Sequence, residues 1–230
     1  MRVYALIPAA GVGSRMQAER PKQYLPLLGR TVAEHTLTTL LQHPAIDRTV
    51  VGIADQDPYW PHIPQSNHVI TVSGGVSRAE TVLNGLRYLR QIATAEDWVL
   101  VHDMARPCLH PEDIDALLAS TNPEGAILGA PVVDTLKQVS GQQIHTTIDR
   151  RQVWRAFTPQ FFPIELLYQA LTQALAAGAN ITDEASAVEW AGGKPSMVQG
   201  RSDNIKITWP GDIALAEFYL QQQAQERACH

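Results

Sequence analysis

A glycine-rich turn stands near the start of the chain, directly after a short apolar run. Residues 3–16 read VYALIPAAGVGSRM, so that Gly11 and Gly13 follow the apolar residues. Backbone N–H groups beside closely spaced glycines can bind phosphate oxygens. Arg15 and Lys22 follow the turn and would add positive charge where negative charge develops in phosphoryl chemistry. The turn therefore predicts a phosphate site, and a turn that only closes a strand is the alternative.

Neither of the two familiar glycine-rich phosphate motifs fits this turn. The dinucleotide fingerprint Gly-x-Gly-x-x-Gly needs a third glycine, and Met16 holds that position. Pro21 and Pro26 also interrupt the helix that should follow at once. The P-loop motif needs a Gly-Lys pair that starts five residues after its first glycine, and Met16 stands at that position after Gly11. An NAD(P)-binding oxidoreductase therefore stays only as an alternative that a binding test would decide.

A second polar cluster ends the apolar run DWVLVHD at residues 97–103. Asp103 stands at the expected carboxyl end of a parallel strand, where α/β sheets bind ligands. A carboxylate there suits Mg²⁺, which prefers carboxylate oxygens and substrate phosphates. Arg106 follows closely, whereas His102 has no metal-ligand partner at a suitable spacing. Asp103 is thus a predicted Mg²⁺ ligand, with a turn cap before Pro107 as the alternative.

Two further stretches carry polar groups in places where chemistry is possible. In GRSDNIKIT, residues 200–208, Asp203 precedes an expected apolar strand that contains Lys206. Lysine is depleted in strands, so Lys206 either faces water or acts in a cleft. In ITDEAS, Thr182 and Asp183 are expected to cap a helix, although a helix N-terminus also favours an anion.

The composition excludes several classes of function. The 230 residues carry a net charge of −5, which argues against a nucleic-acid-binding protein. Cys108 and Cys229 share no metal or redox spacing, as is typical of a reducing compartment. No signal peptide or membrane-length apolar run is evident, so we expect a cytoplasmic protein without a membrane partner. Motifs of hydrolytic triads and zinc sites are absent from the sequence.

Apolar runs and helical periodicity alternate along the chain, which predicts an α/β fold with a mainly parallel twisted sheet. Strands are expected at 3–9, 48–54, 68–72, 97–103, 125–133 and near 196–200. Helices are expected at 31–43, 77–89, 111–120, 163–177, 182–190 and from Pro210 onward. Capping boxes, Thr31 with Glu34 and Ser77 with Glu80, mark the first two helix starts.

Residues 134–157 break this alternation. Two short extended segments around Ser140-Gly141 predict a protruding β-hairpin arm with a polar surface. Such a hairpin has too little apolar surface to be stable alone, so we expect it to pack on another surface, such as a second subunit. Without repeats or linkers elsewhere, residues 1–230 are predicted to form one domain with this arm.

The ordered motifs resemble the 2-C-methyl-D-erythritol 4-phosphate cytidylyltransferase family of isoprenoid biosynthesis over nearly the whole chain. They are PAAGVGSRM, PKQYLPLLG, GGVSRAETVLNGL, VHDMARP, PVVDTLK, TIDRRQVWRAFTPQFF, TDEASAVE and GRSDNIKIT. The resemblance implies a Rossmann-like nucleotidyltransferase fold and transfer of CMP from CTP to methylerythritol phosphate, with Mg²⁺ present and pyrophosphate released. A ribitol 5-phosphate cytidylyltransferase is the nearest alternative, and a non-catalytic nucleotide-binding homologue is another.

The resemblance also implies roles for individual residues. The expected catalytic residues are Arg15, Lys22, Arg150 and Lys206. The expected nucleotide-binding residues are Pro8, Ala9, Ala10, Gly11, Gly13, Gly74, Gly75, Arg78, Thr81, Asp103 and Met104. The expected substrate-binding residues are Arg106, Thr135, Thr158, Thr182 and Asp203, with Asp103 and Asp203 at the metal. In a homodimer, the arm would carry Thr135 and Arg150 onto the partner's site.

Two positions depart from the family's usual pattern. Met104 stands where an alanine is usual, and a larger side chain beside the ribose site is expected to affect the fit of the nucleotide. Thr81 replaces an expected serine, which is a milder change because the hydroxyl is kept.

Overall fold

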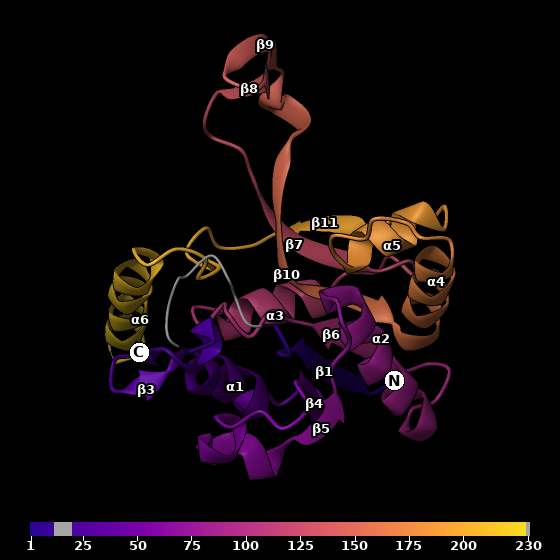
Figure 1. Cartoon of the computed structure of the whole chain (residues 1–230), viewed down its shortest axis with the longest axis vertical. Helices are drawn as coiled ribbons and strands as arrows, with labels where there is room; N and C mark the ends of the chain where they lie inside the picture. Colours follow the sequence, from indigo (N-terminus) through magenta and orange to yellow (C-terminus); the bar gives the residue numbers. More distant parts are fainter. Residues whose placement is uncertain (12–19, 229–230) are drawn as a thin grey trace.

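The computed structural model describes residues 1–11 and 20–228, and its strands and helices alternate as predicted. Within these residues, one sheet contains seven strands in the order β11-β7-β10-β6-β1-β4-β5. They are β1 (Val3–Pro8), β4 (Ile46–Ile53), β5 (Ile70–Ser73), β6 (Trp98–Val101), β7 (Ala126–Pro131), β10 (Trp154–Pro163) and β11 (Ser196–Gln199). The helices are α1 (Val32–Gln42), α2 (Arg78–Ile92), α3 (Pro111–Leu118), α4 (Ile164–Ala176), α5 (Glu184–Trp190) and α6 (Asp212–Ala228). Figure 1 shows their arrangement.

The sheet is mainly parallel, which confirms the predicted fold class. Strand β1 pairs in parallel with β4 and β6, β4 with β5, and β7 with β11. Strand β10 alone among these runs antiparallel, between β6 and β7. No strand was predicted there, because Pro159 interrupts the apolar pattern and prolines are disfavoured inside sheets. The ladder with β7 adapts by a register shift between Ala156 and Gln160.

The apolar run of β1 is explained by burial on both faces of the sheet. Tyr4 and Leu6 belong to one hydrophobic cluster, whereas Ala5 and Ile7 belong to another, and all four are 0% exposed. Side chains alternate between the two faces of a strand, so a strand covered on both sides has no polar positions. Strand β1 is therefore the centre of the core.

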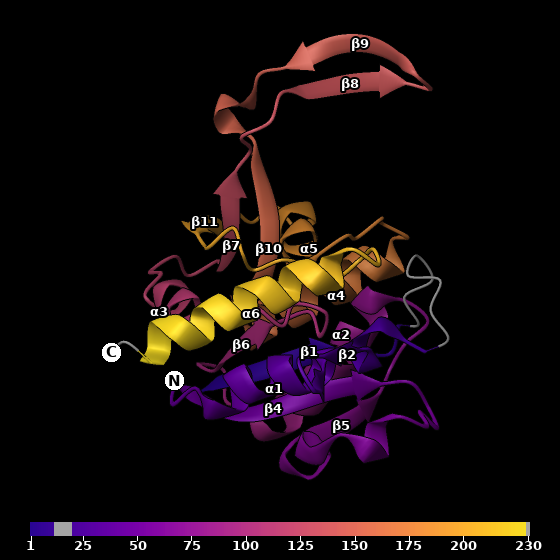
Figure 2. The same cartoon turned by 90° about the vertical axis from the view of Figure 1, so that its left-hand side faces the viewer.

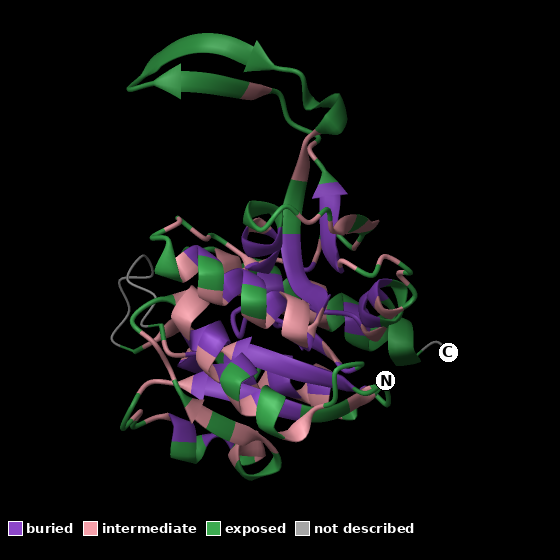
Figure 3. Cartoon of the chain, turned by 90° about the vertical axis from the view of Figure 1, so that its right-hand side faces the viewer, coloured by how far each residue is buried: buried purple, intermediate pink, exposed green. Residues whose placement is uncertain are grey.

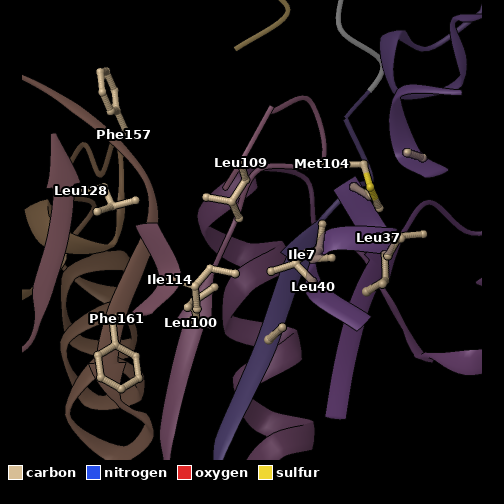
Figure 4. Packing of buried hydrophobic residues seen from close by; sticks show 14 of the residues in the cluster. Ile7, Leu37, Leu40, Leu100, Met104, Leu109, Ile114, Leu128, Phe157 and Phe161 are labelled. Carbon is tan, nitrogen blue, oxygen red and sulfur yellow. The ribbon is translucent and has the colours of Figure 1, made fainter. Parts of the chain in front are cut away.

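Helices cover both faces of the sheet and supply these two clusters. Helices α2, α4 and α5 contribute Leu86, Leu171 and Val188 to one of them. Helices α1 and α3 contribute Leu37 and Ile114 to the other, which Figure 4 shows against the sheet. The layered arrangement leaves the carboxyl ends of the parallel strands open to a ligand.

The predicted capping boxes set the start of the first two helices. Glu34 donates its backbone N–H to the Thr31 hydroxyl at 3.2 Å, and its carboxylate accepts the N–H of Thr31 at 2.7 Å. The same pair of bonds joins Ser77 and Glu80, at 3.1 and 3.2 Å, so α2 begins at Arg78. Because each capping box fixes the first turn of its helix, the loop before α2 is held in a defined position at the edge of the sheet.

The predicted hairpin is present as β8 (Leu136–Ser140) and β9 (Gln143–Ile148), which pair antiparallel. It projects from the ends of β7 and β10, well away from the sheet, as Figure 2 shows from the side. Figure 3 shows that its residues are exposed almost throughout. Residues 154–157, which the sequence analysis assigned to the arm, belong to β10 in the sheet.

Smaller elements complete the description. These are β2 (Pro26–Leu27), β3 (Arg30–Thr31), and the 3₁₀ helices at Lys22–Tyr24, Trp60–His62, Pro64–His68 and Arg150–Gln152. No helix within residues 1–11 and 20–228 has the length and apolar character needed to cross a membrane.

The expected strand after Asp203 is wrong. Residues 204–208 form no strand in the structure, although they lie near the end of β6. The backbone N–H of Ile207 donates to the carbonyl of Ala105 at 2.8 Å. The carbonyls of Asn204 and Ile207 instead accept side-chain donors, from Arg106 at 2.6 Å and from Lys22 at 2.8 Å. Side-chain donors thus satisfy these carbonyls, which in a β-ladder would accept N–H groups of a neighbouring strand.

Candidate active site

A pocket of about 300 Å³ lies at the carboxyl ends of β1 and β6. The chain continues from β1 to β4 and β5 on one side, and then returns to β6 on the other side of β1. This reversal of strand order leaves a crevice in which open α/β sheets bind ligands. The predicted site residues that line the pocket are Pro8, Ala9, Ala10, Gly11, Lys22, Gly75, Arg78, Thr81, Asp103, Met104 and Lys206. These predicted residues therefore lie together around one pocket, and their roles stay predictions.

Two glycine-containing loops meet at one wall of the pocket. A Cβ atom on Gly74 would collide with the Cβ of Ala10, so the close approach of the two loops requires glycine there. The N–H of Gly75 donates to the Thr81 hydroxyl at 3.0 Å. The methyl group of Thr81 lies against Gly52, where a Cβ would collide with it. The threonine in place of the usual serine is therefore accommodated by the glycine in β4.

Gln23, which was not predicted as a site residue, fixes the first of these loops. Its side chain is buried, and its amide donates to the carbonyl of Ala9 at 3.0 Å and to that of Gly11 at 3.4 Å. With these two carbonyls held by an amide, the loop backbone keeps one orientation at the pocket. A single glutamine beside a lysine gives no sequence signal of this role.

Asp103 is buried at the base of the pocket and pairs with three cationic side chains. Its Oδ1 accepts the Nε–H of Arg78 at 2.9 Å, and its Oδ2 accepts Lys206 Nζ at 2.7 Å. The Nε of Arg106 lies 3.7 Å from Oδ2. Burial alone would raise the pKa of Asp103, but the charges of Arg78, Lys206 and Arg106 hold it well below its ordinary value. Asp103 is therefore a carboxylate at neutral pH.

A buried histidine supports the backbone of Asp103. The N–H of Asp103 donates to the Thr158 hydroxyl at 3.0 Å, and that hydroxyl lies 3.1 Å from Nδ1 of His102. The Thr158 proton then points to Nδ1, which leaves Nε2–H of His102 to donate to the carbonyl of Arg106 at 3.2 Å. Complete burial lowers the pKa of His102 to about 4, so the ring is neutral.

Arg106 and Thr158, both predicted to bind the substrate, make their hydrogen bonds inside the fold. Arg106 is 8% exposed, and its guanidinium donates to the carbonyl of Asn204 and lies over the Phe157 ring. Asn204 in turn donates its amide to the carbonyl of Thr158 at 2.9 Å. Neither Arg106 nor Thr158 lines the pocket. Their predicted contact with a substrate stays a prediction, while the structure shows them supporting Asp103 and the 204–208 segment.

Lys22 and Lys206 reach the pocket from opposite parts of the chain. Lys22 is the first residue of the 3₁₀ helix Lys22–Tyr24, and its Nζ donates to the carbonyl of Ile207. Lys206 precedes Ile207 and pairs with Asp103. The segment 204–208 therefore links both lysines, because it carries one of them and accepts a hydrogen bond from the other. Positive charge is thereby concentrated on one side of the pocket.

Several predicted residues lie elsewhere. The Asp203 carboxylate accepts hydrogen bonds from Arg201 at 2.7 to 3.1 Å and does not line the pocket. Thr182 is exposed just before α5, where Asp183 rather than Thr182 provides the N-cap. Thr135 and Arg150 are exposed on the arm, where Arg150 donates to the carbonyl of Val133. Gly13 and Arg15 lie outside the described residues.

Met104, the other departure from the family pattern, is 3% exposed. Its side chain belongs to the hydrophobic cluster beneath α1, near Leu37 in Figure 4, while the residue also lines the pocket. Its carbonyl accepts the Thr36 hydroxyl at 2.8 Å. The core therefore takes up much of the larger side chain, and its effect on nucleotide fit stays a prediction.

The acidic group of the pocket, Asp103, suits a metal ion that arrives with phosphate. Among the described residues, no group of three or more His, Cys, Asp or Glu side chains could hold a metal ion. Asp103 is the acidic residue in the lining of the pocket, and the Asp203 carboxylate is engaged by Arg201. A single carboxylate together with substrate phosphates and water is a common Mg²⁺ environment. Asp103 therefore fits a nucleotide-bound Mg²⁺, whereas a second ligand at Asp203 has no support from this geometry.

The chain is similar to known proteins over nearly its whole length. The IspD family model, 2-C-methyl-D-erythritol 4-phosphate cytidylyltransferase, matches residues 3–222. A relative of that name in Haemophilus influenzae (strain PittEE) is 54% identical over 219 residues, which cover 95% of this chain and 96% of the relative. A relative of the same name in Aliivibrio fischeri (strain MJ11) is 53% identical over 231 residues, which cover 98% of this chain and 97% of the relative.

Solved structures agree with these relatives. A crystal structure of 4-diphosphocytidyl-2C-methyl-D-erythritol synthase matches with a TM-score of 0.83 and 40% identity, over 95% of this chain and 98% of that one. The Francisella tularensis 2-C-methyl-D-erythritol 4-phosphate cytidylyltransferase matches with a TM-score of 0.83 and 32% identity, over 95% and 100%. The fold, the pocket and these matches lead to one conclusion: the chain belongs to the 2-C-methyl-D-erythritol 4-phosphate cytidylyltransferase family.

Proposed function

We propose that this chain transfers CMP from CTP to 2-C-methyl-D-erythritol 4-phosphate, giving 4-diphosphocytidyl-2-C-methyl-D-erythritol and pyrophosphate. The observation that carries the proposal is the cluster of Arg78, Asp103 and Lys206 beside Lys22, at the end of β1 and β6 and next to two glycine loops. Relatives with this activity in their names align over nearly the whole chain. The ribitol 5-phosphate alternative is not favoured by these matches.

The pocket suits an in-line displacement at phosphorus. A phosphate oxygen of the acceptor forms a bond to the α-phosphorus of CTP, and the bond from that phosphorus to pyrophosphate breaks. Such a reaction depends on positioning and on charge neutralisation rather than on a covalent nucleophile. Lys22 and Lys206 supply fixed positive charge on one side of the pocket, and the loop after β1 would offer the backbone N–H groups of Ala10 and Gly11. Arg15 is proposed as a further cation.

Mg²⁺ is proposed as the cofactor. Asp103 would hold the ion together with phosphate oxygens of the nucleotide, because it is the acidic residue in the pocket lining. The ion would neutralise charge on the triphosphate and on the departing pyrophosphate. Lys206 and Arg78 already keep Asp103 ionised, so that the carboxylate needs no proton release before it meets a cation.

A homodimer completes the proposal. Thr135 and Arg150 lie on the projecting arm and are not part of the pocket of their own chain. The arm also exposes apolar side chains, Val139 at 55% and Ile144 at 64%, which a free hairpin would not be expected to leave in water. In the proposed dimer, each arm brings Thr135 and Arg150 to the partner's sugar-phosphate pocket. The cytoplasmic location expected from the sequence stays a prediction.

A direct assay separates the two acceptors. Purified protein with CTP and Mg²⁺ receives either methylerythritol phosphate or ribitol 5-phosphate, and pyrophosphate release is followed with a coupled assay. The expected result is rapid release with methylerythritol phosphate and little with ribitol 5-phosphate. Release with ribitol 5-phosphate alone would overturn the proposal. The fluorescence of NADH is expected to stay unchanged when the same protein is added. A change would show NADH binding, which the oxidoreductase alternative requires.

A further inference from the structure

Glu184 is a buried carboxylate in contact with a residue of the pocket. It is the first residue of α5, its side chain is 1% exposed, and it does not line the pocket itself. Its Oε1 and Oε2 accept hydrogen bonds from the two terminal nitrogens of Arg78, at 2.7 and 3.1 Å. A buried carboxylate is stable only with such a partner, because water no longer solvates its charge. The two residues are 106 positions apart in the chain.

Arg78 is held from two sides by carboxylates. Its Nε donates to Asp103 at 2.9 Å while both terminal nitrogens donate to Glu184. A guanidinium has five N–H groups in one plane, so these bonds leave one N–H on each terminal nitrogen for a ligand. Burial alone would lower the pKa of Arg78, but the charges of Glu184 and Asp103 raise it. The guanidinium is therefore charged and fixed in direction.

The sheet fixes Glu184 in turn. Gln160 of β10 is 1% exposed, and its Oε1 accepts the N–H of Ala185 at 2.9 Å. The amide of Gln160 also donates to the Asp183 carboxylate at 2.8 Å. Strand β10 pairs with β6, which leads directly into Asp103. Glu184 and Asp103, the two carboxylates that hold Arg78, are thus anchored to neighbouring strands.

We propose that Glu184 is a positioning residue for nucleotide binding, which acts by directing the guanidinium of Arg78 into the pocket. Without its charge, Arg78 is free to turn its fork onto both oxygens of Asp103. It would then compete with Lys206, which donates to Oδ2 of Asp103. The inference rests on the proposed function in so far as the ligand is CTP. No sequence pattern predicts this role, since an acid in the first turn of a helix is ordinary.

The test begins with Glu184→Gln, which keeps the size of the side chain and removes its charge. Isothermal titration with CTP is expected to show a Kd raised by about tenfold or more, because a charge-assisted pair is lost. The KM of the acceptor is expected to change by less than about twofold, since Arg78 serves the nucleotide half of the pocket. An unchanged Kd for CTP in a folded Glu184→Gln protein would overturn the proposal.

Helix α2 offers a matched control. Arg90 on the same helix donates to both oxygens of Glu165 on α4, at 2.8 and 3.4 Å. This pair also has two hydrogen bonds, made by Nε and one terminal nitrogen of the arginine, but its side chains are about 40% exposed and neither residue lines the pocket. Glu165→Gln is expected to leave CTP binding unchanged. Equal losses of CTP affinity in Glu165→Gln and Glu184→Gln would show that the effect does not depend on the contact with Arg78, and would contradict the proposal.

A double-mutant cycle separates positioning from general support of the fold. In an Arg78→Met background, Glu184→Gln is expected to alter the Kd for CTP by less than about twofold, because Glu184 then has no guanidinium to direct. A tenfold loss in both backgrounds would overturn the proposal. If Arg78→Met does not fold, Glu184→Asp replaces it. That variant keeps the charge and is expected to bind CTP more tightly than Glu184→Gln, and an equally weak Asp variant would overturn the proposal.

The same data distinguish this inference from the proposed function. Titration with CTP alone involves no acceptor, so it is independent of which polyol phosphate is used. A wild-type protein that binds CTP but does not convert methylerythritol phosphate would contradict the proposed function and leave the role of Glu184 intact. If the wild type turns over normally but the losses of CTP affinity in Arg78→Met and Glu184→Gln add in the double variant, only the role of Glu184 is contradicted.

Discussion

Lys206 and Asp103 are 103 positions apart in the chain, yet Nζ of Lys206 lies 2.7 Å from Oδ2 of Asp103. The pair joins the segment after β11 to the loop after β6 across the pocket. It gives the pocket both a fixed cation and a carboxylate that stays ionised at neutral pH. The proposed chemistry needs both, because the triphosphate brings negative charge and Mg²⁺ needs an oxygen ligand.

Lys206→Met removes this cation and keeps the apolar stem. We expect kcat/KM to fall by about a hundredfold or more, because charge on the transition state is less well neutralised. Steady-state pyrophosphate release measures the change. Lys194→Met is the control, since Lys194 is exposed and does not line the pocket. Near-normal kcat/KM in Lys206→Met would show that the lysine only supports the structure.

Lys22→Ala is expected to separate catalysis from binding. Lys22 lines the pocket, and its Nζ lies 2.8 Å from the carbonyl of Ile207. If its charge acts mainly in the transition state, kcat falls by about a hundredfold or more, while the Kd for CTP rises far less. Single-turnover kinetics and titration calorimetry give the two values. Losses of the same size in both would show that Lys22 serves ground-state binding.

Much of the fold follows from local patterns in the sequence. The buried run of β1, the capping boxes of α1 and α2, and the turn of the arm each depend on residues close together in the chain. Strand β10 was not predicted, because Pro159 interrupts its apolar pattern. The segment after Asp203 was wrongly predicted as a strand, because its apolar residues pack in the core without pairing to a neighbouring strand. Both errors arise where tertiary contacts override local preference.

The site was predictable to a similar extent. Lys22, Arg78, Asp103 and Lys206 belong to motifs of the sequence, and all four line one pocket. Glu184 was not predicted, because its pairing with Arg78 depends on how α2 and α5 lie over the sheet. The hydrogen bonds of Arg106 and Thr158 inside the fold were also not predicted, since a sequence does not distinguish an arginine that binds a ligand from one that binds a backbone carbonyl.

His102 predicts a specific pH dependence of stability. Its pKa is about 4 in the fold against an ordinary value of 6.5, so between these values the unfolded chain binds a proton that the folded chain does not. The free energy of unfolding should therefore fall as the pH drops from about 6.5 to 4, by up to about 3 kcal/mol from this group.

His102→Gln removes this titration. Urea unfolding from pH 7 to pH 4.5 is expected to show a flatter pH dependence in the variant, so that the stability gap between wild type and variant narrows in acid. The loss of the hydrogen bond from Thr158 lowers the stability of the variant at all pH values. Parallel curves for the two proteins would show that His102 is not held neutral.

Mixing two inactive variants tests whether the arm acts on the partner. In a dimer of Lys22→Ala and Arg150→Ala chains, one site has both intact residues if Arg150 comes from the other chain. Random mixing after unfolding and refolding is then expected to restore about a quarter of wild-type activity. If the arm serves the pocket of its own chain, every site lacks one residue and the mixture stays inactive. Each variant refolded alone is the control.

The fate of oxygen atoms tests the central claim most directly. Methylerythritol phosphate labelled with ¹⁸O in its phosphate is incubated with the protein, CTP and Mg²⁺, and the products are resolved by ³¹P NMR. If the acceptor phosphate attacks the α-phosphorus of CTP, the label is found in the diphosphate of the cytidyl product, and pyrophosphate carries none. Labelled pyrophosphate, or consumption of CTP without a methylerythritol-linked diphosphate, would contradict the account.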